Sequence, residues 1–467
     1  MSCFSRKLSN MNVISSFLVA VFSGCVLTTV YVLLTHNLLH RHLHTSINIE
    51  VHLSNFSYMS KLLDKTQKSL PKQIVPESQK RIIIIDEKKN GKSQVKQTHR
   101  DIKKIRSYAY HQDLDILKWK RPSFLQEYKN PCWLETKHTK TTCRHGAFYH
   151  VKFKEDLKPP ILRCLPYFYM VGQPRSGLTN IYERLIRHPD IIAPHMKDIF
   201  WIQRHRFQLR CSSVNTYLDF FHEISENIRM NATIDIKTNT SYYNKVTGDC
   251  SGDVMWDNTR WQDLSGNENC TEPCLTNADY INHLNPSAKI IVALRDPIDR
   301  VYSDYLAQSV WLKYDPDNEL FNKLVIEQIF QLEKCLINNH TIRYCVYNRD
   351  IYHSDSQVRV GIGLYAIHLE DWYRVFPKNQ MHIIQFETFI TDTENEMSRI
   401  FKFLNLQNLG SSEMKYIMEP VFKNVRTRFA EGPDMWIETR KILTKFYEPY
   451  NILLSKLLYD KKYLWKS

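Results

Sequence analysis

The sequence predicts an α/β fold in which helices flank a central parallel β-sheet. Two observations lead to this prediction. From about Asn130 onward, short apolar runs alternate with amphipathic stretches. One of these runs, Leu165–Val171, passes through a glycine-bounded turn directly into a helical pattern. Strands that alternate with helices usually form a parallel sheet, because each helix carries the chain back across the sheet.

The other elements are predicted from their periodicity and their end signals. The first helix is closed by His188 and Pro189, because the residue before a proline disfavours helix. Asp296 is a typical N-cap residue and Pro297 a typical first helical residue. After Leu165–Val171 we expect strands over Ala288–Leu294 and Met381–Phe386, and helices over Thr179–Arg187, Leu364–Phe376, Glu394–Leu404 and Ile437–Leu458, the last broken at Pro449.

The N-terminal part has the pattern of a membrane anchor. No Asp, Glu, Lys or Arg occurs from Leu8 to His40, and stretch 13–34 would span about 33 Å as a helix. A cleaved signal peptide has a shorter apolar region. Arg6 and Lys7 precede the stretch, which favours a cytosolic N-terminus. We expect a single-pass type II protein with a cytosolic tail over 1–12, a transmembrane signal anchor over 13–34, a luminal stem over 35–129 and the folded domain over 130–467.

The charge of the chain favours an acidic partner. The formal net charge of the 467 residues is +14. Such an excess is typical of proteins that bind nucleic acid, anionic lipid or a polyanionic glycan, although a solvated basic surface gives the same count. Asn-x-Ser/Thr sequons agree with a secretory location and occur at Asn55, Asn231, Asn239, Asn269 and Asn339.

Nine of the 11 cysteines follow the expected anchor. Cys270 and Cys274 are close enough in sequence to pair, and so are Cys335 and Cys345. An odd number leaves at least one thiol free or bonded to another chain, so a homodimer, disulfide-linked or non-covalent, stays open. A zinc site is disfavoured, because no Cys-x-x-Cys motif pairs with a second one.

The most informative motif is the turn between the first strand and the first helix. The N–H groups of such a loop and the positive end of the helix dipole point at one spot, which makes an anion site. Its spacing is nearly that of a P-loop, but Leu178 stands where ATP-binding loops have a lysine, and the basic residue is Arg175. We therefore expect a phosphate other than the γ-phosphate of ATP. The candidate phosphate-binding residues are Gly172, Gln173, Pro174, Arg175, Ser176, Gly177, Leu178 and Thr179.

A second block, Leu294–Leu306, supplies another anion site. Arg295 follows the end of a predicted strand, and Ser303 lies about two turns into the following helix. A guanidinium and a hydroxyl that converge at the carboxyl end of a strand suit a second phosphate. An ordinary capped helix with surface charges is the alternative for this block alone.

The two blocks together, in this order, resemble the sulfotransferase superfamily. In that family the first loop holds the 5′-phosphosulfate of 3′-phosphoadenosine 5′-phosphosulfate (PAPS), and the Arg and Ser of the second block hold the 3′-phosphate. The resemblance implies that Arg295 and Ser303 bind the 3′-phosphate, that 3′,5′-ADP is the product, and that no metal is required.

Further blocks are similar to the carbohydrate branch of the family, and in particular to N-acetylgalactosamine 4-sulfate 6-O-sulfotransferases. They are Asn130–Trp133, Leu162–Tyr169, Met255–Asn258, Met435–Leu443, Phe446–Asn451 and Tyr463–Trp465. Those enzymes are type II Golgi membrane proteins acting on chondroitin and dermatan sulfate. The resemblance, over about residues 130–465, implies a sulfated glycosaminoglycan acceptor rather than nucleic acid as partner.

The chain departs from the family pattern in the first loop. The family sequence is usually Lys-[Ser/Thr/Cys]-Gly-Thr-Thr, and here it is Arg175–Thr179. An arginine keeps the positive charge but is a poor proton donor, because its pKa exceeds 12. Leu178 replaces a hydroxyl that would touch phosphate, which should weaken nucleotide binding.

The segment that holds the family's catalytic glutamate also differs. The matching segment is His195–Trp201, in which Lys197 matches, Asp198 replaces the glutamate and Phe200 stands at a histidine position. The resemblance implies that Asp198 is the base, and Lys197 adds positive charge near the transferring group. A base must come within about 3 Å of the hydroxyl that it deprotonates. A surface or capping carboxylate and a solvated lysine are the alternatives.

Weaker candidates complete the predicted site. Tyr365 matches a family segment that borders the nucleotide, although its aromatic neighbours at helical spacing also indicate core. Arg426 and Arg428 lie in a loop that resembles the region that closes over the 3′-phosphate or the adenine. The alternatives for these two arginines are exposure to solvent and binding of acceptor sulfates. Ser251, Asp253, Trp256 and Asn258 match acceptor-side positions or form a structural turn.

Two other functions compete with a sulfotransferase. One is a P-loop kinase or NTPase, which the missing lysine after Gly177 disfavours. The other is a non-catalytic, sulfotransferase-like glycan-binding protein, which the changes at Arg175, Leu178 and Asp198 keep open.

Overall fold

The computed structural model describes residues 116–137, 159–208, 211–235, 239–352, 356–421 and 434–465. The expected membrane anchor and most of the expected stem lie outside these residues, as do Arg426 and Arg428. Within the described ranges, no helix is both long and apolar enough to cross a bilayer.

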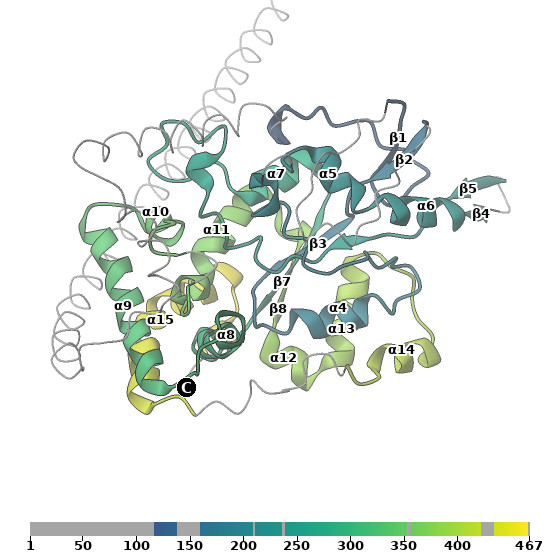
Figure 1. Ribbon diagram of the computed structural model, residues 1–467. Coiled ribbons are helices and arrows are strands. Elements are labelled where there is room, and N and C mark those ends of the chain that lie inside the picture. The colour runs from purple at the N-terminus through teal and green to yellow at the C-terminus, as the bar shows by residue number, and fades with distance from the viewer. Residues whose placement is uncertain are drawn as a thin grey trace, which may run out of the picture.

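The described chain is built around a four-stranded parallel sheet with the strand order β6-β3-β7-β8, so the predicted α/β fold is confirmed (Figure 1). Its strands are β3 (Phe168–Gly172), β6 (Gly248–Asp249), β7 (Lys289–Leu294) and β8 (Met381–Gln385). Two antiparallel pairs lie outside this sheet: β1 (Cys132–Glu135) with β2 (Ile161–Cys164), and β4 (Thr233–Asp235) with β5 (Thr240–Tyr242).

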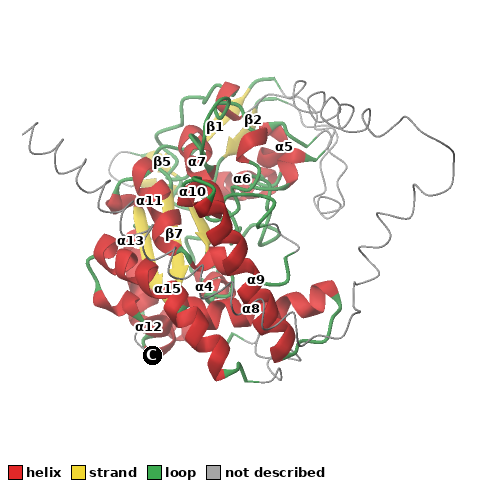
Figure 2. Ribbon diagram, turned by 90° about the vertical axis from the view of Figure 1, so that its left-hand side faces the viewer, coloured by secondary structure: helices red, strands yellow, loops and turns green. Residues whose placement is uncertain are grey.

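Helices lie on both sides of the sheet (Figures 1 and 2). The α-helices are α4 (Leu178–Leu185), α5 (Val214–Asp219), α6 (His222–Met230), α7 (Asn277–Leu284), α8 (Pro297–Leu312), α9 (Asn318–Ile337), α10 (Ile342–Val346), α11 (Tyr365–Val375), α12 (Phe386–Thr391), α13 (Thr393–Phe403), α14 (Ser411–Met418) and α15 (Ile437–Leu458).

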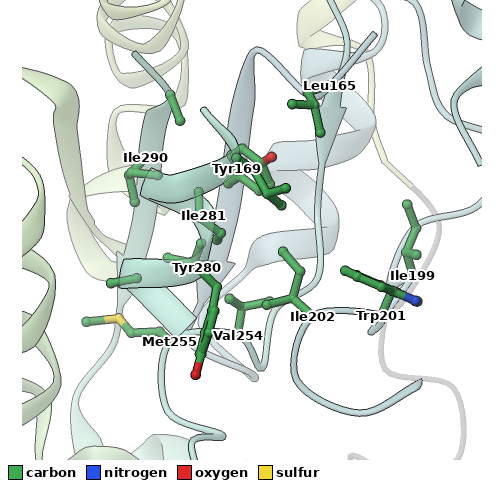
Figure 3. Close-up of a cluster of buried hydrophobic side chains, with 14 of the residues drawn as sticks. Leu165, Tyr169, Ile199, Trp201, Ile202, Val254, Met255, Tyr280, Ile281 and Ile290 are labelled. Atoms are coloured by element: carbon green, nitrogen blue, oxygen red, sulfur yellow. The ribbon is translucent and has the colours of Figure 1, made fainter. Parts of the chain in front are cut away.

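Each face of the sheet is buried by its own set of helices. Tyr169 and Val171 of β3 pack with α7 and α11 in one core cluster, part of which Figure 3 shows. Phe168 and Met170 of the same strand pack with α4 and α13 in another. Because side chains of a strand alternate between faces, a strand buried on both must be apolar throughout. This explains the uninterrupted apolar runs in the sequence.

A third cluster lies between α8, α9 and α15. The sequence prediction of a break at Pro449 is wrong, because α15 continues through that residue from Ile437 to Leu458. A proline inside a helix removes one N–H donor and crowds the preceding turn. Here the buried side chains of Phe446, Tyr447 and Tyr450 anchor the helix on both sides of the proline.

The bounds of the first sheet strand also differ from the prediction. The first sheet strand begins at Phe168 rather than Leu165, and residues 161–164 form the separate strand β2. A disulfide between Cys132 and Cys164 joins β2 to β1. The disulfides Cys270–Cys274 and Cys335–Cys345 are confirmed. Among the described residues Cys250 has a free thiol, and that thiol is buried.

Candidate active site

The first predicted anion loop connects β3 to α4. Gly177 precedes α4 with a φ of 80°, and a Cβ on it would lie 2.7 Å from the ring of Phe386, so a glycine is required there. The N–H of Gln173 donates to the carbonyl of Ala293 in β7 (2.7 Å). The start of the loop is therefore fixed to the carboxyl ends of two neighbouring strands.

Polar groups of this loop are suited to an anion. The first N–H groups of an α-helix have no acceptor within the helix, and here they belong to Leu178 and Thr179 at the start of α4. The Ser176 hydroxyl and the Gln173 amide are buried and have no hydrogen-bond partner in the described structure. An unpaired buried polar group costs about 1–3 kcal/mol. A phosphate oxygen would supply partners, so the loop fits the predicted ligand.

Leu178 contributes differently from the other loop residues. Its side chain is buried and packs in the cluster with α13, against Gly252. Only the backbone N–H of this residue can therefore face an anion.

The second predicted anion site adjoins the first. The Nη1 atom of Arg295 donates to the carbonyl of Arg175 (3.2 Å), and the Nε atom of Arg175 donates to the Ser303 hydroxyl (3.1 Å). The guanidinium of Arg295 lies over the ring of Phe386, 5.0 Å from its centroid. The structure thus brings Arg175 together with Arg295 and Ser303, which lie 120 and 128 residues later in the sequence.

A buried cluster of charged side chains, Asp304, Arg300 and Arg359, lies next to the second anion site. The carboxylate of Asp304 accepts hydrogen bonds from Arg359 (2.5 and 2.9 Å) and from Arg300 (3.3 Å). Burial alone would raise the pKa of Asp304, but the two guanidinium groups hold it below its ordinary value. One carboxylate faces two arginines, so the cluster keeps a positive charge next to Ser303. Desolvation and repulsion from Arg295, Arg300 and Arg359 lower the pKa of Arg175.

Tyr365 does not form an exposed wall of the site. Its ring is buried in the core, and its hydroxyl donates to the carbonyl of Arg295 (2.9 Å). The core position that the aromatic neighbours of this residue indicate is confirmed, and a contact of the tyrosine with the nucleotide stays a prediction. The tyrosine instead fixes the backbone of an arginine in the second anion site.

The candidate base lies beside the first loop. The Oδ1 atom of Asp198 accepts from the N–H of Gly252 (3.3 Å), and the carbonyl of Gly252 lies 3.4 Å from the position that a Cβ of Gly172 would take. Asp198 also forms an ion pair with Lys197. The side chain of Asp198 is 33% exposed, so the carboxylate is held by the protein and still reachable from solvent.

Two features of the site were not predicted. Phe386 contacts both Gly177 and Arg295; its position directly after the apolar residues of β8 is the signal in the sequence. Gly252 and Ser251 contact the segment that carries Asp198. The sequence analysis gave two alternatives for Ser251, a contact with the acceptor and a structural turn. Within the described ranges, no three His, Cys, Asp or Glu side chains are arranged to hold a metal ion.

Known proteins share this sequence pattern. The model of the sulfotransferase domain family matches residues 166–441, which include both anion sites and the segment of Asp198. The chain is 33% identical over 376 residues to carbohydrate sulfotransferase 15 of Mus musculus, covering 74% of this chain and 66% of that protein. It is 28% identical over 186 residues to heparan sulfate glucosamine 3-O-sulfotransferase 3B1 of Homo sapiens, covering 37% of this chain and 42% of that protein.

Among solved structures, a sulfotransferase from Alicyclobacillus acidocaldarius matches with a TM-score of 0.41 and 19% identity, covering 63% of this chain and 96% of that chain. The chain spans about two thirds of the length of the carbohydrate sulfotransferase 15 relatives. The family match extends over more than half of the chain and contains the sheet, the β3–α4 loop and the second anion site. The chain therefore belongs to the sulfotransferase family.

Proposed function

We propose that this protein transfers a sulfuryl group from PAPS to a hydroxyl of a glycosaminoglycan. The observation that carries the proposal is the convergence of two anion sites at the carboxyl ends of β3 and β7, with an accessible carboxylate beside the first site. The acceptor that we propose is the 6-hydroxyl of N-acetylgalactosamine 4-sulfate in chondroitin or dermatan sulfate, which rests on the resemblance to carbohydrate sulfotransferase 15.

The donor nucleotide is proposed to bind across the two anion sites. The N–H groups at the start of α4 and the Ser176 hydroxyl face its 5′-phosphosulfate, and Arg295 and Ser303 face its 3′-phosphate. Arg175 lies between the two sites, since its side chain reaches Ser303 and its carbonyl holds Arg295. A ligand with phosphates at two positions of one ribose explains why the fold provides two anion sites rather than one.

In the proposed reaction Asp198 accepts the proton of the acceptor hydroxyl. The acceptor oxygen forms a bond to sulfur, and the bond from sulfur to the 5′-phosphate oxygen breaks, so that 3′,5′-ADP leaves with the electron pair. Arg175 and the loop N–H groups stabilise the charge on the departing phosphate. Because a guanidinium is a poor acid, the help of Arg175 is electrostatic rather than proton donation. Lys197 forms an ion pair with Asp198 and adds positive potential near the transferring group.

The remaining parts of the proposal concern the whole chain. We propose that residues 13–34 anchor the protein in the Golgi membrane, that residues 35–129 form a luminal stem, and that residues 130–467 are the luminal sulfotransferase domain. Asn231, Asn239, Asn269 and Asn339 are exposed and are proposed N-glycosylation sites. A homodimer linked through Cys250 is disfavoured, because that thiol is buried.

Turnover of radiolabelled PAPS with chondroitin, dermatan and heparan sulfate acceptors tests the proposal. We expect labelled chondroitin or dermatan sulfate, with the label on the 6-hydroxyl. Binding of polyanions without any turnover would instead support a non-catalytic glycan-binding protein. Binding of ATP in preference to 3′,5′-ADP would support a P-loop kinase or NTPase.

The assignment of the 3′-phosphate site has its own test. Arg295→Ala should weaken 3′,5′-ADP binding by at least about tenfold, because a hydrogen bond to a charged group contributes about 1.5–3 kcal/mol. Arg399→Ala, which removes an exposed arginine of α13 paired with Glu396, is the matched control and should bind normally. Unchanged calorimetric affinity of the Arg295 variant would contradict the role of this arginine.

A further inference from the structure

The segment that carries Asp198 is held by a hydrogen-bond network. No residue of the two anion sites takes part in these hydrogen bonds. The N–H of Asp198 donates to the carbonyl of Cys250 (3.2 Å), and the N–H of Phe200 donates to the Ser251 hydroxyl (3.0 Å). The N–H of Gly252 donates in turn to the Asp198 carboxylate (3.3 Å). Three consecutive residues, 250–252, therefore fix both the backbone and the side chain of the candidate base.

The Ser251 hydroxyl is itself oriented by buried groups. It donates to Oδ1 of Asp249 (2.6 Å), and Oδ2 of Asp249 accepts from the hydroxyl of Tyr217 (2.7 Å). All three side chains are at most 1% exposed. Because a serine has one proton to donate and gives it to Asp249, its lone pairs face the N–H of Phe200. The donor and the acceptor of each hydrogen bond in this network are therefore defined.

The segment needs this support because its backbone is strained. Asp198 and Phe200 have φ values of 62° and 51°. A residue other than glycine in this left-handed region costs about 1–3 kcal/mol and persists only where its surroundings hold it. Ile199, between them, is buried in the core cluster (Figure 3). A core contact at Ile199 and the Ser251 hydrogen bond next to it thus hold the turn on which the carboxylate is placed.

The same network connects the base to the first anion loop through the sheet. Asp249 lies on β6 opposite Tyr169 of β3, in a parallel pair. Beyond β6, the N–H of Met255 donates to the carbonyl of Val171 (2.8 Å), next to Gly172 where the loop begins. The pairing of β6 with β3 therefore sets the distance between the Asp198 segment and the loop.

We propose that Ser251 and Asp249 are positioning residues that hold Asp198 at the correct distance from the group bound in the first anion loop. The inference rests on the proposed function, because it needs Asp198 to act on a substrate. Neither side chain contacts an anion site, so their loss should affect turnover and leave nucleotide binding intact. A displacement of the base by about 1 Å is enough to lower the rate about 100-fold.

The test compares Ser251→Ala with Ser251→Thr, which keeps the hydroxyl. Ser251→Ala should lower kcat by about 10- to 100-fold, with an unchanged KM for PAPS and an unchanged Kd for 3′,5′-ADP. Ser251→Thr should recover most of the lost kcat. Asp249→Asn keeps the side-chain volume but turns an amide N–H toward one of the two donor hydroxyls, and should lower kcat in the same way. It carries the test if Ser251→Ala does not fold.

The matched control is Ser225→Ala, which removes a buried serine hydroxyl bonded to the carbonyl of Phe221 next to α6. It should keep the kcat of the wild-type chain. A wild-type kcat in Ser251→Ala would overturn the inference, and so would a Ser251→Thr variant as slow as Ser251→Ala. A parallel loss of 3′,5′-ADP binding would also overturn it, because it would indicate a general structural role. A wild-type chain without any turnover would overturn the proposed function itself.

Discussion

At the scale of single residues, the candidate site depends on short side chains that the backbone places accurately. The sequence resemblance places Asp198 at the position of the family's glutamate, and an aspartate carboxylate is one methylene closer to the chain. Its contact with the N–H of Gly252 keeps it near the first anion loop. The shorter side chain is therefore matched by a backbone segment that packs directly against residues 249–252.

The role of Asp198 can be measured with two substitutions. Asp198→Asn removes the base and should lower kcat by about 10²- to 10⁴-fold, with unchanged affinity for 3′,5′-ADP. Asp198→Glu keeps the base but moves the carboxylate outward, so it should retain part of the activity lost in the asparagine variant. Glu223→Gln, which removes an exposed carboxylate paired with His195, is the control and should stay active. Full activity of Asp198→Asn would contradict the assignment.

The proximity of Arg175, Arg295 and Ser303 was easier to predict from the sequence than the hydrogen bonds that hold the Asp198 segment. The signals for Arg175, Arg295 and Ser303 are local, because each lies at a fixed spacing from a strand end. The network from Asp249 through Ser251 to Phe200 is not local, because it joins segments about 50 residues apart in sequence. No periodicity or turn signal reports such a contact.

At the scale of elements, the two-residue strand β6 of the central sheet was missed, whereas β3, β7 and β8 were predictable because they are apolar runs buried in the sheet. The pair β1–β2 was not, because four-residue strands outside the main sheet leave little pattern in the sequence. The continuity of α15 through Pro449 was also missed, since local propensity favours a break and only the packing of its aromatic residues outweighs it.

The packing of α9 on α15 contains a buried acid whose titration should affect stability. Glu333 of α9 is fully buried, and neither of its carboxylate oxygens has a partner in the described structure. Burial raises its pKa from 4.5 to about 8, and Lys445 only partly opposes this. Between about pH 4.5 and 8 the folded state therefore binds a proton that the unfolded state has lost. Its contribution to the unfolding free energy is complete below pH 4.5 and falls by about 1.4 kcal/mol per pH unit as the pH rises.

Glu333→Gln removes this titration, so the melting temperature of the variant should depend less on pH than that of the wild-type chain. The difference between the two should be largest near pH 8, where the variant should be the more stable one. Glu448→Gln changes an exposed residue of α15 and serves as the control, with the wild-type pH profile. Parallel melting curves of wild type and Glu333→Gln across this range would show that Glu333 does not titrate as described.

At the scale of the whole molecule, exposed charges and buried charges should respond differently to salt. The full chain carries a formal net charge of +14, whereas the cluster of Asp304, Arg300 and Arg359 is buried behind the second anion site. Exposed charges are screened by dissolved ions over about 8–10 Å, and buried pairs are screened much less. A long polyanion that contacts the surface and a nucleotide that enters the site therefore experience different electrostatics.

This contrast gives a prediction for the proposed acceptor. The Kd of sulfated chondroitin should rise by about tenfold or more between about 50 and 200 mM NaCl, because binding releases counterions from a polyanion. The Kd of 3′,5′-ADP should change less over the same range. Unsulfated chondroitin, which carries fewer charges per disaccharide, is the control and should show weaker binding with a smaller salt dependence. Titration calorimetry at several salt concentrations measures all three, and a salt-independent Kd for sulfated chondroitin would contradict recognition through positive charges of the chain.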